Sequence, residues 1–169
     1  LEHAPDSLRL VCTRDPARAQ VLAQKLGETN RRRQLLTDQT LIHARERHLA
    51  QATAQTRLIF VHHHTYEHGV VGLVAGRLAE EFYLPAIVVS VGQEESRASA
   101  RSIPGFNIVE AIRAEEFLLE EVGGHPMAAG FTIKTEKLDQ LKEMLEKQVA
   151  KSLPEEKLFR QLKIDCQLD

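Results

Sequence analysis

Two short apolar runs on either side of an amphipathic stretch place the strongest constraint on how this chain folds. Residues 58–61 and the β-branched run at residues 86–91 each predict a buried strand. Between them, residues 69–82 carry apolar side chains at helical spacing, and Pro85 prevents that helix from continuing. A strand, a helix and a second buried strand together predict a right-handed crossover between parallel strands. The fold class is therefore α/β.

The second half of the chain adds further strands and helices, which predict a mixed β-sheet with flanking helices. Asn107 is a helix-capping residue, and the apolar residues after it predict one helix that runs into Gly123. Polar and apolar residues alternate near the end of the chain, as in a strand at or near a sheet edge. The predicted segments are an extended segment at 97–103, the helix after Asn107, a strand at 128–133, a helix at 136–151 and a strand at 162–168.

The first 55 residues predict helices that have little core of their own. Residues 6–13 favour a short helix, and Asp15 followed by Pro16 starts a second helix that Gly27 can close. Residues 30–55 lack Gly and Pro and predict a long, mostly polar helix of the kind that links two domains. Its narrow apolar strip recurs every seven residues, at Leu35, Ile42 and Leu49.

The composition excludes several classes of protein. With 43% hydrophobic and 27% charged residues, the chain is expected to be a soluble globular protein and not a disordered one. It has no apolar run near the roughly 18 residues that span a bilayer and no signal-peptide pattern, which predicts no membrane partner. Its two cysteines lie far apart without metal-ligand spacing, so we expect a cytoplasmic location. With a net charge of −2, nucleic-acid binding would require a local basic patch.

Residues 97–133 contain the candidate binding residues. Gly123, Gly124 and Gly130 allow the backbone to come close to another surface, because glycine has no Cβ. His125 follows the first two glycines and can donate a hydrogen bond to a phosphate oxygen. The alternative is that these glycines form ordinary tight turns between the strands and helices of an α/β domain.

Polar residues before this glycine segment fit a phosphate-bearing ligand. Arg97, Ser99 and Arg101 fall on one face of the extended segment, and Ser102 follows them. A guanidinium group offers paired donors to phosphate, and serine hydroxyls can donate as well. His68 stands at the start of a predicted helix, where free backbone amides favour anions. Together these residues predict a groove for a phosphate-bearing ligand.

No complete catalytic site is predicted. His62, His63 and His64 end a strand, where His62 and His64 share one side and His63 faces the other, so the three do not form one metal site. The chain has no Asp-x-Asp, Asp-His-His or P-loop pattern, and no strand–Ser–helix elbow around a serine. We therefore expect a binding surface and assign no metal ligand.

Four segments of the chain resemble the RecJ-type nucleases of the DHH phosphoesterase superfamily. They occur in the family order, cover about residues 58–150 and belong to the DHH-associated domain of that family. The segments are GVVGLVAGRL at 69–78, PAIVVS at 85–90, SARSIPGFN at 99–107 and GGHPMAAGF at 123–131.

The resemblance implies a division of the chain. Residues 1–29 resemble the tail of the DHH catalytic domain, and residues 30–56 resemble the long inter-domain linking helix. The DHH-associated, substrate-binding domain would occupy residues 57–155, and residues 156–169 resemble the lead-in strand to a following OB-type domain. The chain also opens without an initiator Met, and we expect it to be a fragment.

The resemblance also implies an activity. RecJ-type nucleases are single-stranded-DNA exonucleases that work 5′ to 3′ in DNA repair and recombination, with Mn²⁺ or Mg²⁺ held by the DHH domain. This segment would bind single-stranded DNA beside its own DHH catalytic domain and would be inactive alone. A single-strand-binding protein or a helicase is the implied further partner. Arg101 and Ser102 match the family's Arg-Ser pair, and His125 matches the His near the scissile phosphate.

One position departs from the family pattern, and two alternatives stay open. Glu67 stands where these nucleases often carry His, and His68 is the candidate replacement. The first alternative is a DHH-family phosphodiesterase for oligonucleotides or cyclic dinucleotides, although those proteins commonly have a third glycine where Val122 stands. The second is a non-catalytic nucleic-acid-binding relative.

Overall fold

The described part of the chain, residues 4–160 of a computed structural model, contains five α-helices and five strands. The helices are α1 (Ala4–Cys12), α2 (Pro16–Gln51), α3 (His68–Phe82), α4 (Ile108–Arg113) and α5 (Leu138–Ser152). The strands are β1 (Ile59–His63), β2 (Ala86–Ser90), β3 (Glu95–Arg101), β4 (Leu119–His125) and β5 (Ala128–Lys134). The predicted strand at residues 162–168 lies outside the described residues.

The five strands form one mixed sheet in the order β1-β2-β3-β5-β4. β1 and β2 are parallel, with Ile59 opposite Ala86, as predicted for a strand–helix–strand crossover. All other neighbouring strands are antiparallel. The predicted α/β fold, with a mixed sheet, flanking helices and a long helix before them, is confirmed.

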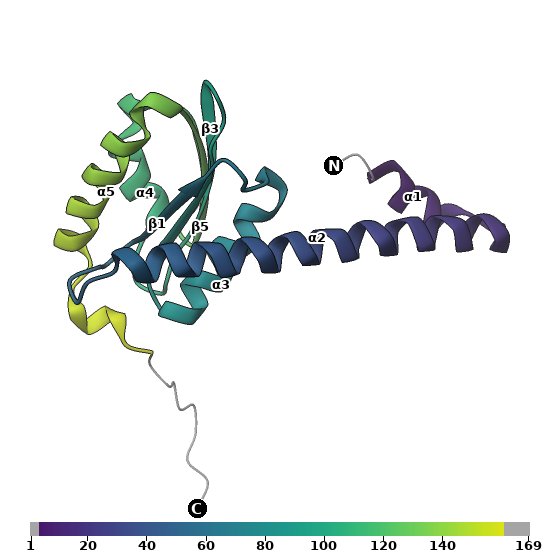
Figure 1. The fold of residues 1–169 in the computed structure, drawn as a ribbon, viewed down its shortest axis with the longest axis horizontal. Coiled ribbons are helices and arrows are strands. Elements are labelled where there is room, and N and C mark those ends of the chain that lie inside the picture. Colours follow the sequence, from purple (N-terminus) through teal and green to yellow (C-terminus); the bar gives the residue numbers. More distant parts are fainter. Residues whose placement is uncertain (1–3, 161–169) are drawn as a thin grey trace, which may run out of the picture.

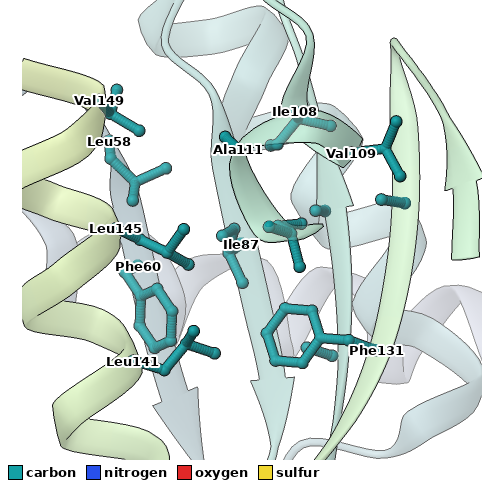
Figure 2. Packing of buried hydrophobic residues seen from close by; sticks show 14 of the residues in the cluster. Leu58, Phe60, Ile87, Ile108, Val109, Ala111, Phe131, Leu141, Leu145 and Val149 are labelled. Atoms are coloured by element: carbon teal, nitrogen blue, oxygen red, sulfur yellow. The ribbon is translucent and has the colours of Figure 1, made fainter. Parts of the chain in front are cut away.

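Helices α4 and α5 cover one face of the sheet and enclose the larger core. Leu141 and Leu145 of α5 are buried against the sheet, at the spacing predicted for this helix. Figure 2 shows these side chains facing Phe60 of β1, with Ile87 and Phe131 farther along the same face. This core fixes the strands in place from one side.

Helix α3 covers only part of the opposite face. Its buried residues Val71, Val74 and Leu78 pack with Ile59 and Val88, which belong to β1 and β2. Farther along that face, the side chains of β3, β5 and β4 are half-exposed or exposed. Half of one sheet face is therefore left open beside α3.

Helix α2 begins as predicted but does not end at Gly27. The Asp15 side chain accepts hydrogen bonds from the amides of Ala17 and Arg18, the latter at 3.4 Å, and Pro16 follows it. The helix then continues through Gly27 without a break and ends at Gln51, so its total length is 36 residues. A glycine inside a helix costs only about 1 kcal/mol, which a helix of this length can absorb. The predicted helix end at Gly27 is wrong.

The predicted apolar strip of α2 faces solvent. Its members are exposed to 64%, 58% and 55%, at Leu35, Ile42 and Leu49. Instead, α2 packs through a polar and small-residue face that includes Thr37, Thr40, Ala44 and His48. Small side chains allow α2 to lie close to the domain, and the half-buried Leu41 packs against the core beside them.

The N-terminal half of α2 extends past the sheet, and α1 folds back beside its far end (Figure 1). Asp6 of α1 accepts a hydrogen bond at 2.7 Å from Lys25 of α2 and is 3.2 Å from Arg9. The hydrogen bond from Lys25 lowers the pKa of the Asp6 carboxyl. No helix among the described residues is long and apolar enough to cross a membrane.

Residues 119–125 form strand β4, where the sequence favoured the end of a helix. Helix α4, capped by the Asn107 side chain as predicted, already ends at Arg113. In the sequence, Glu120 and Glu121 look like the solvent-exposed face of a helix. In the structure, this segment pairs with β5 as a strand, with a register shift between Leu119 and Glu121. The strand forms because β5 supplies hydrogen-bond partners that no local pattern reveals.

A buried and an exposed leucine should contribute differently to the stability of the fold. Leu145 is 1% exposed, so Leu145→Ala leaves a cavity and should lower the free energy of unfolding by about 3 kcal/mol. Leu35→Ala removes the same atoms from an exposed site and should change it by less than about 0.5 kcal/mol. Urea denaturation of both variants measures the difference. Equal losses would show that the α2 strip is packed in solution.

Candidate nucleic-acid interface

The open half of the sheet face begins at β3. Arg97, Ser99 and Arg101 share this face, because the alternate residues Ala98 and Ala100 are buried in the core on the other side. The predicted alignment of the two arginines and the serine on one face is therefore confirmed.

Strand pairing extends these three positions into three rows across β3, β5 and β4. The first row joins Arg101, Ala128 and His125, and it ends at the β4–β5 turn. Successive rows are about 7 Å apart along the strands, because side chains on one face recur every second residue. The second row joins Ser99, Gly130 and Gly123, and the third joins Arg97, Thr132 and Glu121.

The middle row has almost no side chains. Gly123 and Gly130 leave the sheet surface flat, and only the Ser99 hydroxyl rises from it. A Cβ added at Gly123 would meet nothing within 4 Å, so packing inside the protein does not require this glycine. A flat, backbone-lined floor is what a closely approaching ligand requires.

Gly124 has a different role from its neighbour. Its φ is +144°, and an added Cβ would lie 2.4 Å from the Ala128 carbonyl oxygen and 2.5 Å from the Ala129 Cα. Only glycine fits both the backbone conformation and the space. Gly124 is therefore required for the backbone conformation of the β4–β5 hairpin, whereas Gly123 leaves the open face of the sheet without a side chain at its position.

A groove of about 550 Å³ lies over the second and third rows. Its polar lining includes Arg97, Ser99 and Thr132 on the sheet, and His68 stands above them at the start of α3. No side chain caps the N-terminus of α3, which leaves amide donors at this end of the groove. The structure therefore brings His68, Arg97 and Ser99, three of the predicted binding residues, together in one groove.

Arg101 lies along α3. An added Cβ on Gly72 would be 3.1 Å from its Nη2 atom, so glycine makes room for this side chain. The Nη1 atom of Arg101 donates to the Ala100 carbonyl at 2.8 Å. On its other side, Arg101 lines a hollow of about 420 Å³ between α2 and α3, together with Arg33 and Arg77. Arg101 thus connects the sheet rows to a second, arginine-rich hollow.

The hydroxyl of Ser102 is turned into the protein. It is buried, and its proton is donated to the Phe106 carbonyl at 2.6 Å. Its backbone amide donates to the Met127 carbonyl at 2.9 Å. In this geometry Ser102 stabilises the turn beside Arg101, and its hydroxyl is not directed into the groove that Ser99 lines.

His125 lies at the exposed end of β4, in the row that contains Arg101. Within residues 4–160 its ring forms no hydrogen bond or ion pair, so its nitrogen atoms are accessible to a ligand. A ring in this position can donate to a phosphate placed over the first row.

The three consecutive histidines do not separate as predicted. His62 faces Phe60, with 6.3 Å between ring centroids, whereas His63 lies 4.7 Å from His43 of α2. His64 lies 4.2 Å from His63 and does not share the side of His62. The alternation fails because β1 ends at His63 and the chain then turns.

His43, His63, His64 and Tyr66 form an aromatic cluster in which one hydrogen bond joins two rings. His43 Nδ1 is 3.0 Å from the hydroxyl of Tyr66, whose burial raises its pKa to about 12. Desolvation and the neighbouring histidines lower the pKa of His63. Among the described residues, no group of three or more His, Cys, Asp or Glu side chains is placed to hold a metal ion.

Sequence reasoning missed three residues that line these hollows: Thr132, Glu121 and Arg33. Thr132 could have been found from the alternation of residues 128–133. Glu121 was hidden because its segment was predicted to be a helix, and Arg33 because a run of arginines on a polar helix is usually solvated.

The sheet order, the partly covered face and the glycine-lined groove define a DHH-associated domain. Residues 52–151 match the model of the DHHA1 domain, and the chain belongs to that family. It is 34% identical over 167 residues to the single-stranded-DNA-specific exonuclease RecJ of Bacillus subtilis (strain 168), in a match that covers 98% of this chain and 21% of that protein. The chain therefore spans about a fifth of the curated relative's length.

Solved structures show the same likeness. The crystal structure of RecJ in complex with Mg²⁺ from Thermus thermophilus matches with a TM-score of 0.78 and 33% identity, over 89% of this chain and 23% of that one. A crystal structure of exonuclease RecJ bound to manganese matches with a TM-score of 0.75 and 34% identity, over 87% of this chain and 36% of that one. The resemblance to RecJ-type nucleases is confirmed.

The two neighbouring glycines of β4 should respond differently to alanine. Gly124→Ala forces a strained backbone and a clash, so it should lower the free energy of unfolding by more than about 2 kcal/mol. Gly123→Ala enters open space and should change it by less than about 0.5 kcal/mol. Thermal and urea unfolding measure both. A severe loss at Gly123 would mean that its role is structural.

Proposed function

We propose that this chain is the substrate-binding part of a 5′ to 3′ single-stranded-DNA exonuclease that acts in DNA repair and recombination. The observation that carries the proposal is the side-chain-free floor of Gly123 and Gly130, with arginines in the rows on both sides. The likeness to RecJ proteins supports the polymer and the reaction. The whole protein would be a hydrolase of phosphodiester bonds.

Each predicted site residue has a role in this proposal. Arg97, Ser99 and His68 hold phosphate oxygens where the amides of α3 also point. Arg101 binds the adjacent phosphate from its place along α3. Gly123 lets the nucleic acid approach the strand backbone.

The remaining predicted site residues lie at or near the end of the hairpin. Gly124 gives the β4–β5 turn its shape, and His125 presents its ring near the scissile phosphate. Ser102 supports the position of Arg101 through the buried turn.

The chemistry is assigned to parts of the protein outside this chain. The described residues do not provide a fitting set of ligands for Mn²⁺ or Mg²⁺, although the matched RecJ structures hold these ions. We therefore propose that the metal ions and their ligands belong to a DHH catalytic domain joined to α2. A single-strand-binding protein or a helicase is the proposed further partner.

A phosphodiesterase for short oligonucleotides or cyclic dinucleotides is the less favoured alternative. RecJ proteins match this chain over most of its length in both sequence and structure. The groove is also open along the strands, because most residues of β4 are exposed. An open groove suits a continuing strand better than an enclosed small ligand.

Salt dependence tests the proposed phosphate contacts. Each phosphate contact on single-stranded nucleic acid contributes about −0.7 to the slope of log K against log salt. Arg101→Ala should weaken the binding of single-stranded DNA about tenfold and make the slope shallower by about 0.7. His125→Ala should also weaken the binding of single-stranded DNA, because it removes a hydrogen-bond donor to phosphate. Fluorescence anisotropy over a salt series measures both quantities.

Arg113→Ala is the matched control, because Arg113 is exposed at the end of α4, on the opposite side of the sheet. It removes the same charge and should leave the affinity and the slope nearly unchanged. An equal effect of Arg101→Ala and Arg113→Ala would reduce Arg101 to a contributor of net charge and remove it from the site.

Metal addition tests the assignment of chemistry. The isolated 169-residue chain should bind single-stranded DNA but release no nucleotides when Mn²⁺ is added, because its described residues hold no metal cluster. Chromatography of a labelled oligonucleotide measures the products. Mn²⁺-dependent cleavage that His125→Ala abolishes would place the reaction within this chain.

A further inference from the structure

The groove over β3, β5 and β4 carries opposite charges on its two walls. Its α3 side presents His68, Arg97 and the amide donors of the helix N-terminus. Its β4 side presents the carboxylate of Glu121. A groove that bound only phosphate would not need an acidic wall, because a carboxylate repels phosphate. Glu121 therefore requires a separate explanation.

Strand pairing fixes the positions of these charges. Arg97 is opposite Thr132, and Thr132 is opposite Glu121, so the three lie in one row on the open face. Arg97 and Glu121 are two strand spacings apart, about 10 Å between Cα atoms. Within residues 4–160, neither forms an ion pair or a side-chain hydrogen bond. Both charged groups are available to one ligand that spans the row.

The charges of this row favour one orientation of a bound nucleotide. The phosphate is attracted to the α3 side by His68, Arg97 and the helix amides and is repelled by Glu121. The base then extends over the Thr132 position toward β4. A carboxylate can only accept hydrogen bonds, so it favours a base edge that donates them. Cytosine, adenine and guanine carry such an amino group, whereas the one donor on the pairing edge of thymine, its N3–H, lies between two carbonyl oxygens that the carboxylate repels.

We propose that Glu121, together with Thr132, forms a nucleobase subsite that prefers bases with an exocyclic amino group over thymine. This inference rests on the proposed function, because it takes single-stranded DNA as the ligand of the groove. It adds a base preference to a surface whose other contacts are made to the backbone. Glu121 acts as a specificity residue and takes no part in bond cleavage.

Two pyrimidine oligonucleotides of equal length test this subsite. Oligodeoxycytidylate and oligodeoxythymidylate of about 12 nucleotides carry the same charge, so a difference in affinity reports on the bases. Near neutral pH and at fixed salt, the 169-residue chain should bind the cytidylate about fivefold more tightly, as expected for one exposed base contact. Fluorescence anisotropy with both labelled oligonucleotides measures this ratio.

Glu121→Gln should reduce the ratio to less than about twofold, chiefly by tightening the binding of thymidylate. The amide has no negative charge, and its NH₂ group can donate to a thymine carbonyl. Glu120→Gln is the matched control, because Glu120 is exposed on the same strand but does not line the groove. It should leave the ratio unchanged.

The outcomes separate this inference from the proposed function. A ratio that Glu121→Gln abolishes and Glu120→Gln preserves would support the subsite. Binding of both oligonucleotides with equal affinity by the unaltered chain would overturn the subsite and leave the proposed function standing. Equal tightening of both oligonucleotides by the two variants would also overturn it, since Glu121 would then act only as a repulsive charge. Failure to bind either oligonucleotide would overturn the proposed function and the subsite together.

Discussion

The candidate site depends on the packing of α3 against one part of the sheet. Val71, Val74 and Leu78 bury the apolar side of this helix over β1 and β2, which leaves the same face open from β3 onward. On the flank of α3 that faces β3, Gly72 leaves space for Arg101. A larger side chain there would push Arg101 from its position, so the hydrophobic packing and the polar site depend on one helix placement.

The open half of the sheet carries positive charge that the net charge of the chain does not reveal. The chain has a net charge of −2, yet Arg97 and Arg101 stand in rows that are separated only by a row of glycine and serine. The absence of side chains at Gly123 and Gly130 would let the proposed polymer ligand come within reach of both arginines. Local geometry, and not net charge, therefore gives this surface its proposed affinity for phosphate.

Helix α2 is attached to the domain mainly by close packing. Arg45 pairs with Glu81 at 2.7 Å and Arg77 with Asp38 at 2.6 Å, but these side chains are exposed or half-exposed. Such surface ion pairs contribute at most about 1 kcal/mol each. Ala44 is buried against α3 and the sheet, and its small side chain permits a short distance between the axes of α2 and α3. The attachment thus follows from close packing, to which the half-buried Leu41 also contributes.

The sequence by itself determined the elements whose patterns are local. These are the β1–α3–β2 unit, the capped starts of α2 and α4, the apolar face of α5 and the alternation that aligns Arg97, Ser99 and Arg101. Only the tertiary structure decided that residues 119–125 form a strand and that Glu121 lines the groove. It also decided that the apolar strip of α2 faces solvent. Each of these depends on a partner far away in the chain. Hydrogen bonds from β5 and contact with α3 outweigh the weak local preference, which no pattern within the segment records.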